Sequence, residues 1–183
     1  MAELYERVAA ERRRLRQVRQ ALTQATTQTS EGHADWAPFY IAIADYFEAA
    51  MARLHAQDIR MGEMLRDKAD MGEPDNQHAM AELEERLSGN QQHLKQMLAA
   101  RDELNADAQA GLQSFESAGK AYADYIVANM GHHPGSTNMA QELFSSDDWA
   151  HMADVSEADQ VREEHLFERV FASVPASLVL TEQ

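Results

Sequence analysis

The stretch WAPFYIAIADYFEAAMARLHAQDIRMGEMLRDK, which occupies residues 36–68, decides the fold class. Its apolar side chains recur every three or four residues, which is the spacing of one face of an α-helix. They are Ile43, Phe47, Ala50, Leu54, Met61 and Leu65. Asp58 stands where this repeat calls for an apolar residue. We therefore predict a long amphipathic helix that carries one charged side chain in its apolar seam.

Three further segments repeat the same spacing, at about residues 2–28, 75–104 and 107–130. Short runs rich in glycine, proline and polar residues separate the four segments, and such runs interrupt helices. Helices joined by short connections pack as antiparallel neighbours. Nothing in the chain alternates apolar and polar residues as a half-buried strand does. The sequence therefore predicts an all-α fold with an up-and-down four-helix bundle over about residues 2–131.

Shorter helices are expected in a C-terminal tail over about residues 137–175, packed across one end of the bundle. Asp147 and Ser156 are plausible N-caps there, and the spacing from Ser156 to Asp159 is typical of a capping box. The chain has 183 residues, of which 44% are hydrophobic, enough for one substantial core. We therefore expect one domain, residues 1–183.

The charge of the chain is strongly acidic and unevenly distributed. The net charge is -15, but six arginines and three glutamates give the first twenty residues +3, so the remainder carries -18. An acidic chain repels nucleic acid and anionic membrane surfaces, so we expect neither as a partner. The arginine-rich first segment is instead expected to dock on an acidic surface, either of the same chain or of a second copy in a homodimer.

Cysteine is absent from the sequence, which excludes disulfides, thiolate metal ligands and cysteine nucleophiles. No apolar run reaches the roughly 18 residues of a membrane-spanning helix, and the N-terminal residues do not resemble a secretion signal. We expect a cytoplasmic protein. Gly89 and Gly119 fall inside predicted helices, where close approach of a neighbouring helix explains glycine.

Polar residues interrupt the apolar seams of all four predicted helices, and a buried charge is costly unless it is paired or bound to metal. The residues at or near these interruptions that can ligate a metal are His55, Asp58, His93 and His133, with Glu11 and, in the loop before the second helix, His33 as further candidates. Imidazole and carboxylate ligands without thiolate suit iron, manganese or zinc. Each histidine also has a structural interpretation, as a surface or hydrogen-bonded side chain, and for His33 and His132 that interpretation is preferred.

The order of these residues resembles the hemerythrin-like (HHE) family, whose four-helix bundles hold a non-haem iron pair between histidines and carboxylates. The matching segments are ERRRL at 11–15, RLHAQD at 53–58, QHL at 92–94 and NMGHH at 129–133. Arg12 and Arg13 stand in the region where the family has its first histidine. Three alternatives follow: Glu11 replaces that histidine, the site holds one metal, or an arginine neutralises the carboxylates of a metal-free site.

Two functions follow from these observations. The resemblance implies a non-haem iron protein that binds dioxygen or nitric oxide, handles iron or responds to redox state. The rival is a metal-free helical interaction module that dimerises through its arginine-rich first helix, with its polar seam residues paired together. No nucleotide-binding or hydrolase motif supports an enzyme, and the spacing Glu-x-x-His of ferritin-like sites is absent. The run at 162–165, REEH, is expected to form a solvated helix face.

Overall fold

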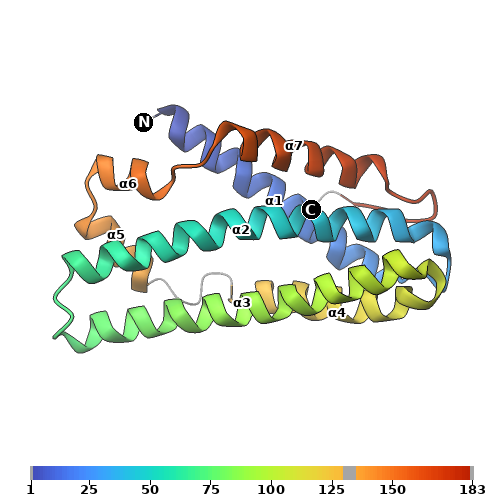
Figure 1. Cartoon of the computed structure of the whole chain (residues 1–183), viewed down its shortest axis with the longest axis horizontal. Helices are drawn as coiled ribbons and strands as arrows, with labels where there is room; N and C mark the ends of the chain where they lie inside the picture. Colours follow the sequence, from blue (N-terminus) through green and yellow to red (C-terminus); the bar gives the residue numbers. More distant parts are fainter. Residues whose placement is uncertain (1, 130–134, 182–183) are drawn as a thin grey trace.

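The computed structural model describes residues 2–129 and 135–181, and this part of the chain is helical without any strand. The elements are α1 (Ala2–Gln28), η1 (Ala34–Trp36), α2 (Ala37–Lys68), α3 (Pro74–Ala106), α4 (Ala108–Asn129), α5 (Gly135–Leu143), α6 (Ser146–Met152) and α7 (Glu157–Ala172) (Figure 1). The all-α prediction is confirmed. The ends of the four long helices differ by at most two residues from the predicted ends.

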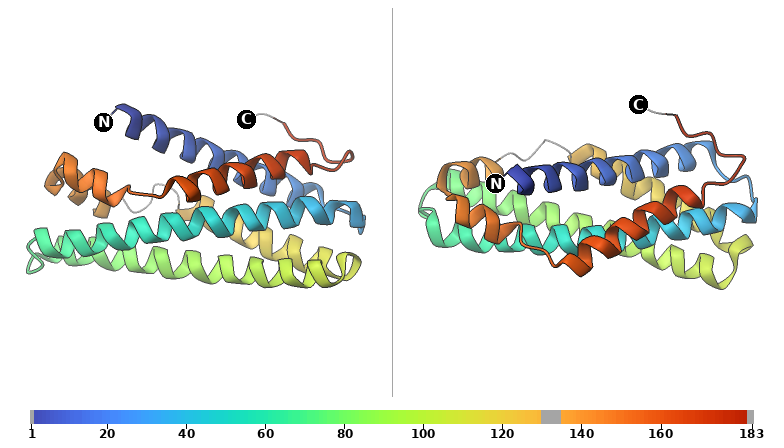
Figure 2. Two further views of the ribbon diagram at one scale, coloured as in Figure 1. Left: turned by 45° about the horizontal axis from the view of Figure 1, so that its top comes forward. Right: turned by 90° about the horizontal axis from the view of Figure 1, so that it is seen from above.

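The long antiparallel hairpin of α2 and α3 forms the centre of the molecule (Figure 1). Helix α4 packs along one half of α3, and α5 packs against the other half of the hairpin. Helix α1 crosses the structure and contacts mainly α4 (Figure 2). The four long helices therefore do not run side by side over their full lengths, because α4 is shorter than α2 and α3.

Helix α7 lies along α2, whereas the sequence led us to expect the whole tail across one end. Residues late in α7 contact residues early in α2, so the two helices are antiparallel (Figure 2). The reason is a stripe on α7 that includes the buried residues Glu163 and Val170, which face α2 rather than solvent. Of the C-terminal helices described, only α5 and α6 cover the end of the hairpin at which α2 connects to α3 (Figure 1).

The apolar core consists of two clusters. The larger cluster joins the C-terminal half of α1, the N-terminal half of α2, the C-terminal half of α3 and α4, and includes Leu22, Phe47, Met97, Phe115 and Tyr122. The smaller cluster lies at the end of the hairpin where α2 connects to α3, and it includes Met61, Leu65, Met80, Leu83 and Phe144. Polar and charged side chains occupy the middle of the α2–α3 hairpin between them.

Two short C-terminal helices begin at serine caps. Ser145, not the expected Asp147, caps α6, and its hydroxyl accepts a hydrogen bond from the Asp148 backbone amide at 3.2 Å. Asp148 in turn accepts one from the Ser145 amide at 2.8 Å, which completes a capping box. The bonds from Ser145, helped by Lys68, lower the pKa of Asp148 to about 2. The predicted cap at Ser156 is confirmed.

Glycine at 119 permits the close approach of α1 and α4. A Cβ atom at this position would lie 3.0 Å from a methyl carbon of Leu22, which is tighter than ordinary packing. The prediction of close helix contact at this glycine is therefore confirmed. Among the described helices, none has the length and apolar character needed to cross a membrane.

Candidate functional site

The polar middle of the hairpin contains most of the residues singled out from the sequence. We call it the polar belt and define it by Arg53, His55 and Asp58 on α2 together with Arg86, Asn90 and His93 on α3. Between residues 84 and 93, α3 has no buried residue, and between 52 and 60, α2 has only Gln57. Helices α1, α4 and α7 bring further polar groups to the belt.

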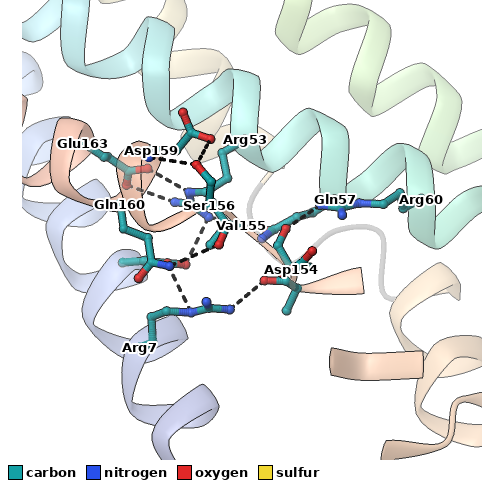
Figure 3. A network of polar contacts seen from close by, with 12 residues as sticks. Arg7, Arg53, Gln57, Arg60, Asp154, Val155, Ser156, Asp159, Gln160 and Glu163 are labelled. Atoms are coloured by element: carbon teal, nitrogen blue, oxygen red, sulfur yellow. Dashed lines mark hydrogen bonds and ion pairs between the residues drawn. The ribbon is translucent and has the colours of Figure 1, made fainter. Parts of the chain in front are cut away.

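Arg53 is the most buried charge of the belt and joins three helices (Figure 3). Its guanidinium donates to both carboxylate oxygens of Glu163 on α7, at 2.8 and 3.0 Å. It also lies 3.1 Å from the carboxylate of Glu11 on α1. Burial alone would lower the pKa of Arg53, but hydrogen bonding and attraction to Glu163, then Glu11, raise it. Arg53 therefore stays charged and compensates two buried carboxylates.

More arginines surround this ionic cluster. Arg7 on α1 lies 3.7 Å from Glu11 and donates to the Ala153 carbonyl at 2.6 Å. Arg60 on α2 donates to the carbonyl of Asp154 at 2.8 Å (Figure 3). These two side chains fasten the connection between α6 and α7 to both long helices. Because Arg7 and Arg60 donate to backbone carbonyls, we assign both a structural role.

His55 of α2 and Tyr122 of α4 donate hydrogen bonds to the same oxygen of Asn90 on α3. His55 Nε2 lies 3.1 Å from Asn90 Oδ1, and Tyr122 donates its hydroxyl to the same oxygen at 3.3 Å. Because an amide oxygen only accepts, His55 must donate through Nε2. Burial lowers the pKa of His55, against the opposing effects of Asn90 and Asp58. The imidazole is therefore neutral at neutral pH and links α2 to α3 and α4.

Asp58 pairs with an arginine of α3. Arg86 of α3 donates to its carboxylate at 3.2 Å. Burial raises the pKa of Asp58, whereas the charges of Arg86, His55 and Arg12 lower it by less. Arginines from two helices thus act on this carboxylate.

His93 stacks on an aromatic ring of α4. Its ring centre lies 4.6 Å from that of Tyr125, and its Nδ1 is buried without a hydrogen-bond partner. Tyr125 donates its hydroxyl to the carbonyl of Arg86 at 3.2 Å. A Cβ at Gly89 would collide with the hydroxyl end of the Tyr125 side chain, so a larger residue at this position would displace the tyrosine.

The five candidate metal ligands among the described residues are not gathered at one point. Glu11 belongs to the Arg53 cluster, His55 and Asp58 lie near each other, and His93 stacks on α4. His33 is exposed in the turn before η1, and His133 lies outside the described residues. Within residues 2–129 and 135–181, no three histidine, aspartate or glutamate side chains form a group that can hold a metal ion. The described residues therefore do not make a hemerythrin-type site.

Sequence reasoning missed Arg53 and Glu163 as partners. The expectation of a solvated face at 162–165 is wrong for Glu163, whose side chain is only 4% exposed. The signal was present, because Glu163 lies seven residues before Val170 and three before Leu166, on the buried stripe of its helix. The pairing of this stripe with α2 could not be read from the sequence.

Comparison with known proteins leaves the chain without an assigned family: no protein family matches it, and no curated protein or solved structure shows significant similarity.

Proposed function

We propose that the protein is a metal-free helical interaction module that forms a homodimer through the basic face of α1. The observation that supports the proposal best is the pairing within the polar belt. Arg53 compensates Glu11 and Glu163, and Arg86 compensates Asp58, so these carboxylates join helices. In this proposal the four long helices serve as a bundle-like scaffold, and the chain, which has no cysteine, acts in the cytoplasm.

The basic face consists of the exposed side chains Arg12, Arg13 and Arg16. Among the described residues, Arg13 and Arg16 make no hydrogen bond or ion pair. Arg7 and Arg14 differ, because they reach Ala153 and Glu164 of the same chain. The two free guanidinium groups of Arg13 and Arg16, on a chain of charge -15, favour an acidic protein surface as the partner.

A second copy offers such a surface, because the chain outside the first twenty residues carries -18. In a two-fold symmetric dimer the same contact occurs twice, so each α1 would face an acidic part of the other copy. Attraction between exposed charges weakens with salt, since the screening length falls from about 10 Å at 0.1 M to about 3 Å at 1 M. The dimer is therefore expected to be salt-sensitive.

Sedimentation velocity at low and high salt tests this proposal. We expect the wild type to be dimeric at low salt and to dissociate as salt is added, and we expect Arg13→Glu/Arg16→Glu to be monomeric throughout. The control Lys95→Glu/Lys120→Glu makes the same change in net charge on α3 and α4 and is expected to dimerise. A monomeric wild type, or equal loss of the dimer in both double variants, contradicts the proposal.

The second candidate is the iron protein that the hemerythrin-like resemblance implies, with dioxygen or nitric oxide as its ligand. Two observations favour it: burial keeps His55 neutral, and His93 has a buried Nδ1 without a partner. Imidazoles on facing helices are suitable iron ligands. This candidate needs ligands outside the described residues, such as His133, because the described residues provide no group of three possible metal ligands. Iron analysis of the purified protein distinguishes the two candidates.

A further inference from the structure

The C-terminal segment 177–181 lies along α1 and is held there by two glutamine side chains (Figure 2). Gln28 donates to the Val179 carbonyl at 2.8 Å and accepts from the Val179 amide at 3.3 Å. Gln24 donates to the Thr181 carbonyl at 3.0 Å and accepts from the Thr181 amide at 2.8 Å. Each side-chain amide thus pairs with both polar groups of one backbone residue.

This pattern requires an extended backbone. In a β-strand the N–H and C=O of one residue point to the same side, and residues two apart repeat that direction about 6.6–6.8 Å along. On a helix, residues four apart are separated by about 6 Å along the axis. Gln24 and Gln28 are four apart, while Val179 and Thr181 are two apart. The helix face therefore matches the repeat of an extended peptide.

The side chains of the segment alternate as this geometry demands. Leu178 is 6% exposed and belongs to the larger apolar cluster, and Leu180 packs against the same cluster. Val179, between them, is 64% exposed. Trp36 donates its indole N–H to the Ser177 hydroxyl at 2.8 Å, at the start of the segment. Backbone pairing and two leucine contacts thus hold the segment, as when a peptide is added to a sheet edge.

We propose that this face of α1 is a docking site for an extended peptide of a partner protein that carries leucines at alternate positions, and that residues 177–181 are its resident occupant. Backbone pairing is independent of sequence, and the apolar contacts of Leu178 and Leu180 select leucine. The resident segment competes because it is tethered behind α7, where a short linker gives an effective concentration in the millimolar range. The site lies on α1 beyond Arg12, Arg13 and Arg16, so it does not depend on the proposed dimer.

The test uses a fluorescent peptide with the sequence of residues 175–181, PASLVLT, and full-length protein. The variant Leu178→Asp weakens the resident segment, so we expect saturable binding of the peptide by fluorescence anisotropy. The wild type is expected to bind about tenfold more weakly or worse, because its own segment competes. Val179→Asp, one residue away on the exposed side, is expected to behave like the wild type.

Two controls make the result decisive. Adding Gln24→Ala/Gln28→Ala to Leu178→Asp is expected to abolish binding, and so is placing Leu178→Asp in the peptide. Circular dichroism verifies folding, and Leu180→Asp replaces Leu178→Asp if that variant is unfolded. The proposal is overturned if the peptide does not bind to a folded Leu178→Asp or Leu180→Asp variant. It is also overturned if binding is unchanged when Gln24 and Gln28 are replaced by alanine.

Discussion

Two ionic clusters of this protein each join three helices, yet they lie in different surroundings. Arg53 of α2 binds Glu11 of α1 and Glu163 of α7, and the three side chains are 4–8% exposed. Arg101 of α3 binds Asp45 and Glu48 of α2, and Arg169 of α7 also pairs with Asp45. In this second cluster the Glu48 side chain is 50% exposed.

The comparison indicates that exposure to solvent, rather than the number of ion pairs, decides how much each cluster contributes to the stability of the fold. Water already stabilises exposed charges, so a surface pair adds about 0–1 kcal/mol. Buried carboxylates have lost that hydration and depend on the arginine that replaces it. The Arg53 cluster therefore fixes where α1 and α7 pack on α2, whereas the Arg101 cluster adds little to that placement.

The largest expected effect is that of Arg53→Met. Without the guanidinium, Glu163 remains buried without its ion-pair partner and Glu11 keeps only Arg7 at 3.7 Å, so the free energy of unfolding should fall by about 3–5 kcal/mol. Urea denaturation followed by circular dichroism measures the change. A loss no larger than that of Arg101→Met would show that the buried cluster does not contribute more to stability than the exposed one.

The triple variant Arg53→Met/Glu11→Leu/Glu163→Leu separates the cost of broken pairing from the value of the pairs. Apolar replacement of a whole buried ionic cluster is often neutral or stabilising by about 1–4 kcal/mol. We expect the triple variant to recover most of the stability lost in Arg53→Met. If it unfolds as easily as Arg53→Met, then the ion pairs themselves, rather than uncompensated charge, determine stability here.

Asn90→Ala tests two partly buried hydrogen bonds between neutral groups, and its expected effect is intermediate. It removes the oxygen that accepts from His55 and Tyr122 and leaves two donors without that partner. An unsatisfied buried donor costs about 1–3 kcal/mol, so the free energy of unfolding should fall by about that amount. The control Gln91→Ala changes an exposed neighbour on the same helix and should have little effect. Equal losses of stability in Asn90→Ala and Gln91→Ala would show that the two hydrogen bonds to Asn90 are not important for stability.

Arg101→Met should lower the free energy of unfolding by less than about 1 kcal/mol. Because this cluster is partly exposed, the effect should shrink further in 0.5 M salt, whereas that of Arg53→Met should persist. Parallel urea titrations of the two variants at two salt concentrations measure this difference. A salt-insensitive effect at Arg101 would mean that its cluster is shielded from solvent.

The smallest expected effect is a pH dependence at His55, whose folded pKa lies below the ordinary value of 6.5. Below pH 6.5 the unfolded imidazole binds a proton before the folded one, so stability falls as the pH falls towards the folded pKa. Burial raises the pKa of Asp58, so this carboxyl contributes to the pH dependence with the opposite sign. His55→Gln should flatten the decline between pH 7 and pH 5 in unfolding measurements. An unchanged slope would contradict this assignment.

The sequence predicted the helices well because their apolar spacing is a local property. It also indicated that Glu11 and Asp58 interrupt apolar seams, and both lie beside arginines in the structure. The partners could not be predicted, since they depend on how distant helices pack. The path of α7 along α2 and the docking of residues 177–181 on α1 are long-range features of the same kind. A histidine in a seam indicates a polar contact without saying whether that contact is a metal or an amide oxygen.

The central claim is that the polar side chains of the belt pair with one another and do not bind metal. Elemental analysis and a visible spectrum of untagged protein, expressed with added iron and reconstituted with ferrous iron, test it most directly. We predict iron far below one equivalent per chain, no charge-transfer bands, and the same result for His55→Ala and His93→Ala. About one or two tightly bound irons per chain, lost in those variants, would contradict the claim and support the hemerythrin-like iron protein.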